Sequence, residues 1–110
     1  MQLVRVRRDV AVDPSSVALL LAGPSAAELW PGDSFAIEVA PPVRALTGYA
    51  AALRVTSDGI DVGQGAVSAA TGSITVELRA DDEVERELRK LLSRYVRRLA
   101  DAVESATSAA

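Results

Sequence analysis

The sequence predicts an α+β protein in which a curved antiparallel sheet wraps around a long C-terminal helix. Residues 81–106 carry apolar side chains at steps of three and four, which places them on one side of an α-helix. Residues 34–80 instead contain runs in which apolar and polar side chains alternate between Pro and Gly residues, as in antiparallel strands. A sheet with one apolar face and a helix with one apolar stripe bury both surfaces by packing together.

Composition predicts a single domain over residues 1–110, with a loose tail over residues 106–110. The chain has 110 residues and is 49% hydrophobic, enough for one core. Its net charge of −3 provides no basic field to attract nucleic acid or anionic lipid. No apolar run approaches the roughly 18 residues that a membrane span requires. We therefore expect a cytoplasmic protein with no nucleic-acid partner and no membrane partner.

The absence of two residue types limits the chemistry that this chain can perform. The chain contains no His, the usual general base and the commonest metal ligand near neutral pH, and no Cys. The inward strand positions offer no pair of carboxylates, because Glu38 and Glu77 both fall on the outward parity. The sequence therefore predicts no catalytic residue, no metal ligand and no cofactor, and it favours a binding or structural role over an enzyme.

The first expected strand covers residues 3–12. Its valines share one parity: Val4, Val6, Val10 and Val12. This period of two is typical of a half-buried strand. Arg8 lies on the same parity as the valines, so its guanidinium group must either reach the edge of the sheet or enter a cavity.

Two short helices are expected next. Asp13 is a favourable N-cap and Pro14 a favourable first residue for a helix that stops at Gly23. Residues 24–30 repeat the same start chemistry, and residues 31–33 form a turn.

Four further strands are expected in a meander, at residues 34–40, 49–56, 60–69 and 73–80. Pro41 and Pro42 end the first of them, because proline cannot donate to a strand ladder. Gly59 completes an Asp-Gly hairpin turn. Gly63 and Gly65 indicate a bulge or bend where the sheet curls. With the first strand, the sheet is expected to have about five strands.

The expected C-terminal helix begins near Asp81 or Asp82, either of which can cap it. Its apolar stripe consists of Val84, Leu88, Leu91, Leu92, Tyr95, Val96, Leu99, Val103 and Ala106. The opposite side is charged and includes Glu85 and Arg89, four residues apart, which can form an ion pair along the helix.

This order of elements is similar to the helix-grip fold of the START-like, or SRPBCC, superfamily, which includes polyketide cyclases and a family of carbon monoxide dehydrogenase subunits. The likeness is carried by residues 6–14, the helices that follow them as far as residues 29–32, and residues 42–49, 67–78 and 91–100. Members of the superfamily usually have seven strands. A version with about five predicts a cavity that is small or open on one side.

The resemblance implies a cleft between sheet and helix that holds a small apolar molecule, as in a ligand-binding or carrier protein. Arg8 and Gln64 would orient the ligand through polar contacts. The other inward residues would line the cleft: Phe35, Ile37, Tyr49, Leu53, Ile74, Val76, Leu92 and Tyr95.

Two alternatives stay open. The same side chains can form a dry core in a non-catalytic module that assembles as a homodimer, through an exposed sheet edge or a helix flank at Ala100, Ala102 and Val103 beside Leu99. The second alternative is a polyketide cyclase-like enzyme. The superfamily has no universal catalytic motif, so no catalytic residue is transferred to this chain.

Overall fold

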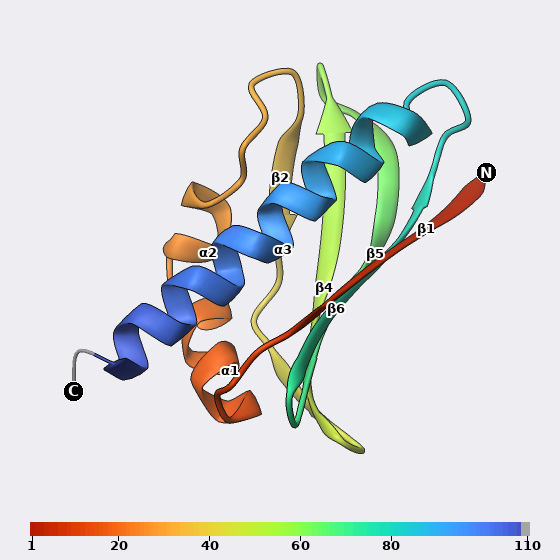
Figure 1. The fold of residues 1–110 in the computed structure, drawn as a ribbon. Helices are drawn as coiled ribbons and strands as arrows, with labels where there is room; N and C mark the ends of the chain where they lie inside the picture. The colour runs from red at the N-terminus through yellow and green to blue at the C-terminus, as the bar shows by residue number, and fades with distance from the viewer. Residues whose placement is uncertain (109–110) are drawn as a thin grey trace.

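The computed structural model of the protein describes residues 1–108 and confirms the predicted α+β architecture (Figure 1). The elements are β1 (Gln2–Asp9), α1 (Pro14–Ala22), α2 (Ser25–Glu28), β2 (Ala36–Val39), β3 (Val43–Ala45), β4 (Gly48–Ser57), β5 (Ile60–Ala70), β6 (Ser73–Ala80) and α3 (Glu85–Ser108). A loose tail was expected over residues 106–110, and α3 continues into that segment as far as Ser108. The rest of that tail lies outside the described residues.

The sheet has six strands in the order β1-β6-β5-β4-β2, with β3 also paired to β4, and the pairs are antiparallel. The strand that the sequence did not predict is β3. Pro42 ends the pairing of the preceding segment as expected, but Val43 then pairs with Ala50 and Arg44 with Tyr49. The long strand β4 therefore carries two short partners on its outer edge, one after the other.

The predicted bend in β5 is confirmed. Val55 pairs with Gly63 and Thr56 with Asp61, so Val62 is an extra residue that forms a β-bulge. Just beyond the bulge, a Cβ atom on Gly65 would lie 1.8 Å from the carbonyl oxygen of Glu77 on β6. The glycine is required there because β5 and β6 approach too closely for any side chain.

The predicted hairpin turn between β4 and β5 is also present. Asp58 and Gly59 have φ angles of 52° and 81°. Positive φ at both central residues is what a two-residue type I′ turn requires, which explains the Asp-Gly pair.

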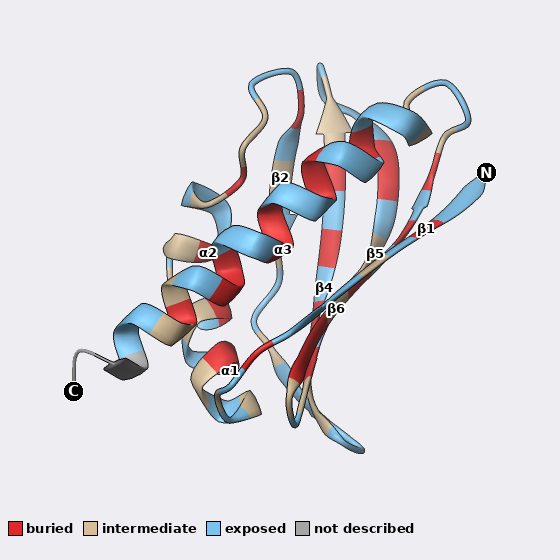
Figure 2. Cartoon of the chain, viewed as in Figure 1, coloured by how far each residue is buried: buried red, intermediate tan, exposed pale blue. Residues whose placement is uncertain are grey.

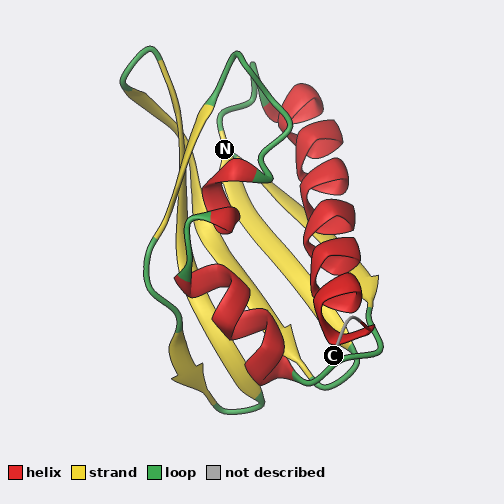
Figure 3. Ribbon diagram, turned by 90° about the vertical axis from the view of Figure 1, so that its left-hand side faces the viewer, coloured by secondary structure: helices red, strands yellow, loops and turns green. Residues whose placement is uncertain are grey.

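All three helices lie on one side of the sheet (Figures 1 and 3). The long helix α3 packs over β1 and β6, α1 packs over β4 and β5, and α2 lies against β2. Burial follows the side of each element that faces this layer (Figure 2). The buried part of the predicted helix stripe comprises Leu88, Leu91, Leu92, Tyr95, Val96, Leu99 and Val103. Of the remaining two members, Val84 is half-buried and Ala106 is exposed.

The flank of α3 that was expected to pair with a second copy is instead part of the core. Leu99, Ala100 and Val103 are buried, and Ala102 is half-buried. The prediction of helix pairing through this flank is therefore wrong, because the helix uses a wider apolar arc against its own sheet than the stripe alone indicated. Within residues 1–108, no helix combines the length and apolar character needed to cross a membrane.

Candidate functional site

The centre of the layer between sheet and α3 is filled with side chains. Four predicted ligand contacts, Ile74, Val76, Leu92 and Tyr95, have no exposed surface. A side chain without exposed surface borders no space large enough for a water molecule. Leu53 and Phe35 are also buried, at 3% and 6% exposure. The six residues belong to one buried cluster and form a packed core in this structure.

Tyr95 has a structural role in closing this layer. Its hydroxyl group donates a hydrogen bond to the carbonyl oxygen of Ala26 in α2, at 2.5 Å. Its ring meets the ring of Trp30 edge to face, with centroids 5.5 Å apart, and the indole nitrogen of Trp30 donates to the carbonyl of Phe35 at 3.1 Å. Burial raises the pKa of the Tyr95 phenol above its ordinary value, so the group stays protonated.

The concave face of the sheet is less covered along β2. Ile37 pairs with Val55 and Val39 with Leu53, so each pair shares one face of the sheet. The two β4 residues are buried, whereas Ile37 and Val39 are half-buried. Since β2 is the outermost strand at this point, nothing within the sheet shields its far side. Val39 was not among the predicted site residues, although it shares its parity with Ile37.

Tyr49 lies further along the same edge of the sheet. We call the half-buried residues Ile37, Val39 and Tyr49 the open margin. Tyr49 pairs with Arg44 of β3. Both residues line a hollow of about 410 Å³ between the β3–β4 hairpin and the start of α1, where Asp13, Pro14 and Ser15 form the opposite wall. Sequence reasoning missed Arg44 because its place opposite Tyr49 depends on β3, which was not predicted.

Arg8 reaches the edge of the sheet. It pairs with Ile74 and therefore shares the parity of the concave face, but its side chain is exposed on the outermost strand β1. Of the two alternatives left open by the sequence, the structure shows the one in which the guanidinium group stays in water.

The predicted inward position of Gln64 is wrong. Gln64 is exposed and its amide donates a hydrogen bond to the Asp61 carboxylate at 3.2 Å, on the face of the sheet away from the helices. The reason is the bulge. Val62 at the bulge is buried, whereas Val67 and Ala69 are the buried residues after it, so the inward parity changes from even to odd numbers within β5.

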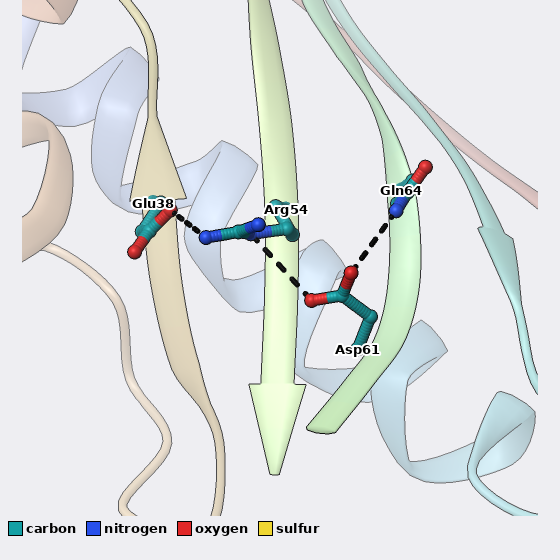
Figure 4. Close-up of polar contacts among 4 residues, drawn as sticks. All are labelled: Glu38, Arg54, Asp61 and Gln64. Atoms are coloured by element: carbon teal, nitrogen blue, oxygen red, sulfur yellow. Dashed lines mark hydrogen bonds and ion pairs between the residues drawn. The ribbon is translucent and has the colours of Figure 1, made fainter. Parts of the chain in front are cut away.

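On that outer face, Gln64 belongs to a polar network across three strands (Figure 4). Arg54 on β4 bonds to Glu38 on β2 at 2.5 Å and forms an ion pair with Asp61 on β5 at 3.5 Å. A neighbouring hollow of about 350 Å³ is lined by Glu38, Arg54 and Gln64 and by small residues that include Ala52. The three charged side chains are 45–67% exposed, so solvent weakens their interaction and the network is a feature of the surface.

The described acidic residues do not assemble into a metal site. Among the described residues, no three His, Cys, Asp or Glu side chains come close enough to hold a metal ion. Glu38 and Glu77 both lie on the outer face, paired with Arg54 and Arg5 respectively. The concave margin offers apolar side chains together with Tyr49 and Arg44, and Asp13 lies across the hollow from them.

Comparison with known proteins shows that the fold is shared. The chain aligns with the crystal structure of DynU16, a protein of the dynemicin biosynthetic locus, with a TM-score of 0.69 at 20% identity over 96% of its own length. It also aligns with CV1439 from Chromobacterium violaceum (TM-score 0.61, 14% identity) and TTHA0849 from Thermus thermophilus (TM-score 0.61, 12% identity). These alignments cover 94% and 96% of this chain and 99% of each of the other two.

The chain spans about half of DynU16, 48% of its length. No family model matches the sequence. No curated protein matches it either. At these identities the likeness establishes a common fold, and the chemistry must be argued from the residues of this chain.

Proposed function

We propose that the chain binds a small, largely apolar molecule on the concave side of its sheet, as a ligand-binding or carrier protein. The observation that carries the proposal is the open margin along β2, β3 and the start of β4. Here Ile37, Val39 and Tyr49 face the concave side and yet are only half-buried. Membership of DynU16 in a biosynthetic locus is in keeping with a small-molecule ligand on this fold.

A ligand along this margin does not need to enter the packed centre. It would lie on the three half-buried side chains, with Phe35 and Leu53 behind them as part of the buried wall. Covering apolar surface contributes about 25 cal/mol per Å², so roughly 200 Å² of newly covered surface supplies about 5 kcal/mol before the cost of association. This area is within reach of a flat aromatic molecule or a short acyl chain.

Thermal unfolding in the presence of flat aromatic and acyl compounds tests the proposal. A compound present at one hundred times its Kd stabilises the folded state by about 2.7 kcal/mol, which raises the Tm by roughly 10 °C for a domain of this size. Val39→Asn should remove most of the shift, because it places a polar group in the apolar margin. Val43→Asn is the matched control, because Val43 is an exposed valine that pairs with Ala50 on the outer face. If no compound raises the Tm, or if both variants respond like the wild type, the margin is not the binding site.

A second candidate is a dry-core module that assembles as a homodimer. The packed centre of the layer favours the dry core, and the chain presents edges at β1 and at β2 with β3 that a second copy can pair with. In this case the Tm should rise with protein concentration and stay unchanged by the compounds. Sedimentation at micromolar concentration that gives a monomer with a cooperative melt would eliminate it.

A further inference from the structure

We infer that the ligand is an apolar monocarboxylate and that Arg44 binds its carboxylate. This inference rests on the proposed function and adds a polar end to the apolar margin. It starts from the position of one side chain that neither sequence reasoning nor the fold comparison indicated.

The register of β3 places Arg44 beside Tyr49. Residues directly opposite each other in an antiparallel pair share a face, with Cβ atoms about 5 Å apart. Tyr49 shares its face of β4 with Ala51 and Leu53, which are both buried under the helices. Arg44 is therefore on the concave side, and it lines the same hollow of about 410 Å³ as Tyr49.

The guanidinium group of Arg44 is available to a ligand. Arg5 and Arg54, on the outer face, each form an ion pair with an acid on the neighbouring strand. Arg44 is exposed and forms no ion pair with any residue in the described part of the chain. A planar guanidinium group can bind a carboxylate through two parallel hydrogen bonds.

The spacing along β4 sets the size of the ligand. Val39 pairs with Leu53 and Arg44 with Tyr49, so the two positions on the margin are four residues apart along β4. At about 3.3 Å per residue this is roughly 13 Å. An aromatic acid of two fused rings, or an acyl chain of moderate length, covers the apolar part and reaches the arginine with its carboxylate.

One other charge borders the hollow. Asp13, at the start of α1, is exposed and lines the wall opposite the hairpin. Its carboxylate makes no hydrogen bond to cap α1. A bound carboxylate would be repelled by Asp13 and attracted by Arg44, so changes at the two residues should have opposite effects on affinity.

The test compares 2-naphthoate with 2-naphthamide, which share an apolar body and differ in charge. Their Kd values are measured by NMR titration of the wild type and of the variants Arg44→Gln, Arg44→Lys and Asp13→Asn. We expect the wild type to bind the acid about tenfold more tightly than the amide, as for one charged hydrogen-bonded contact. Arg44→Gln should abolish this preference without weakening the amide, Arg44→Lys should keep part of it, and Asp13→Asn should increase it.

Arg79→Gln is the matched control, because Arg79 is an exposed arginine on the outer face, where it pairs in register with Gln64. Equal Kd values for acid and amide in the wild type overturn the inference and leave the proposed function standing. The same holds if Arg44→Gln and Arg79→Gln bind both compounds alike. Failure of both compounds to bind the wild type overturns the proposed function together with the inference. Unchanged far-ultraviolet circular dichroism and Tm show that each variant is folded.

Discussion

The hydroxyl group of Tyr95 in α3 donates a hydrogen bond to the carbonyl oxygen of Ala26 in α2, which lies 69 residues earlier in the chain. The contact is buried and stands beside the edge-to-face pair of Tyr95 and Trp30. It joins the C-terminal helix to the short helix that follows the first strand. Tyr95 therefore helps to hold the layer closed rather than lining an open cavity.

Replacing Tyr95 by Phe should lower the free energy of unfolding by about 1–3 kcal/mol, because the buried carbonyl of Ala26 loses its donor. Urea unfolding followed by circular dichroism measures the change. Tyr49→Phe is the control, since Tyr49 is half-buried at the open margin and its hydroxyl group can reach water. Equal stability of the two variants would contradict the structural role of the Tyr95 hydroxyl group.

The same residue predicts a dependence on alkaline pH. An unfolded tyrosine has a pKa of about 10, and burial raises the pKa of Tyr95 in the folded chain. Above pH 10 the folded state keeps a proton that the unfolded state has lost. Below pH 10 the protonated Tyr95 phenol contributes its full stabilisation to the folded state. Above pH 10 the free energy of unfolding falls by up to about 1.4 kcal/mol per pH unit. Urea titrations at pH 8 and 10.5 should show a steeper fall for the wild type than for Tyr95→Phe. Parallel curves would show that Tyr95 does not carry the effect.

Leu92 tests the packing of the layer. The side chain is fully buried under the sheet, so Leu92→Ala should cost about 2–5 kcal/mol through lost contacts and a new cavity. Leu19→Ala provides the comparison, because Leu19 is 78% exposed on α1 and its truncation should change stability by less than about 0.5 kcal/mol. Thermal unfolding of both variants measures the difference. A small effect at Leu92 would mean that the layer is loosely packed.

Gly65 tests the close approach of β5 and β6. Gly65→Ala should destabilise the protein severely, because the added Cβ atom would overlap the carbonyl oxygen of Glu77 and the backbone must move. At Gly23, just after α1, an added Cβ atom meets its nearest neighbour at 3.8 Å, an ordinary contact. Gly23→Ala should therefore fold with a stability close to that of the wild type, and the amount of soluble protein and the Tm compare the two. A Gly65→Ala protein as stable as Gly23→Ala would show that the strands can separate there.

Local patterns were sufficient to predict the fold class. The step of three and four in α3, the alternation in β4 and β6, and the turn at Asp58 and Gly59 each depend on residues that are neighbours in the chain. Amphipathic elements of these two kinds have few ways to bury their apolar sides, so the layer of sheet and helix followed from them. The buried wall of Phe35, Leu53, Ile74, Val76, Leu92 and Tyr95 followed from the same patterns.

The tertiary structure alone decided the open margin and its polar end. The extra residue at Val62 reverses the inward parity of β5 and turns Gln64 outward, and pairing to β4 converts the three residues of β3 into a strand that places Arg44 beside Tyr49. Both outcomes depend on which residues of one strand lie opposite those of another. Strand register is set by contacts between segments distant in the sequence, and a shift of one residue moves every side chain to the opposite face, so periodicity within one segment cannot determine it.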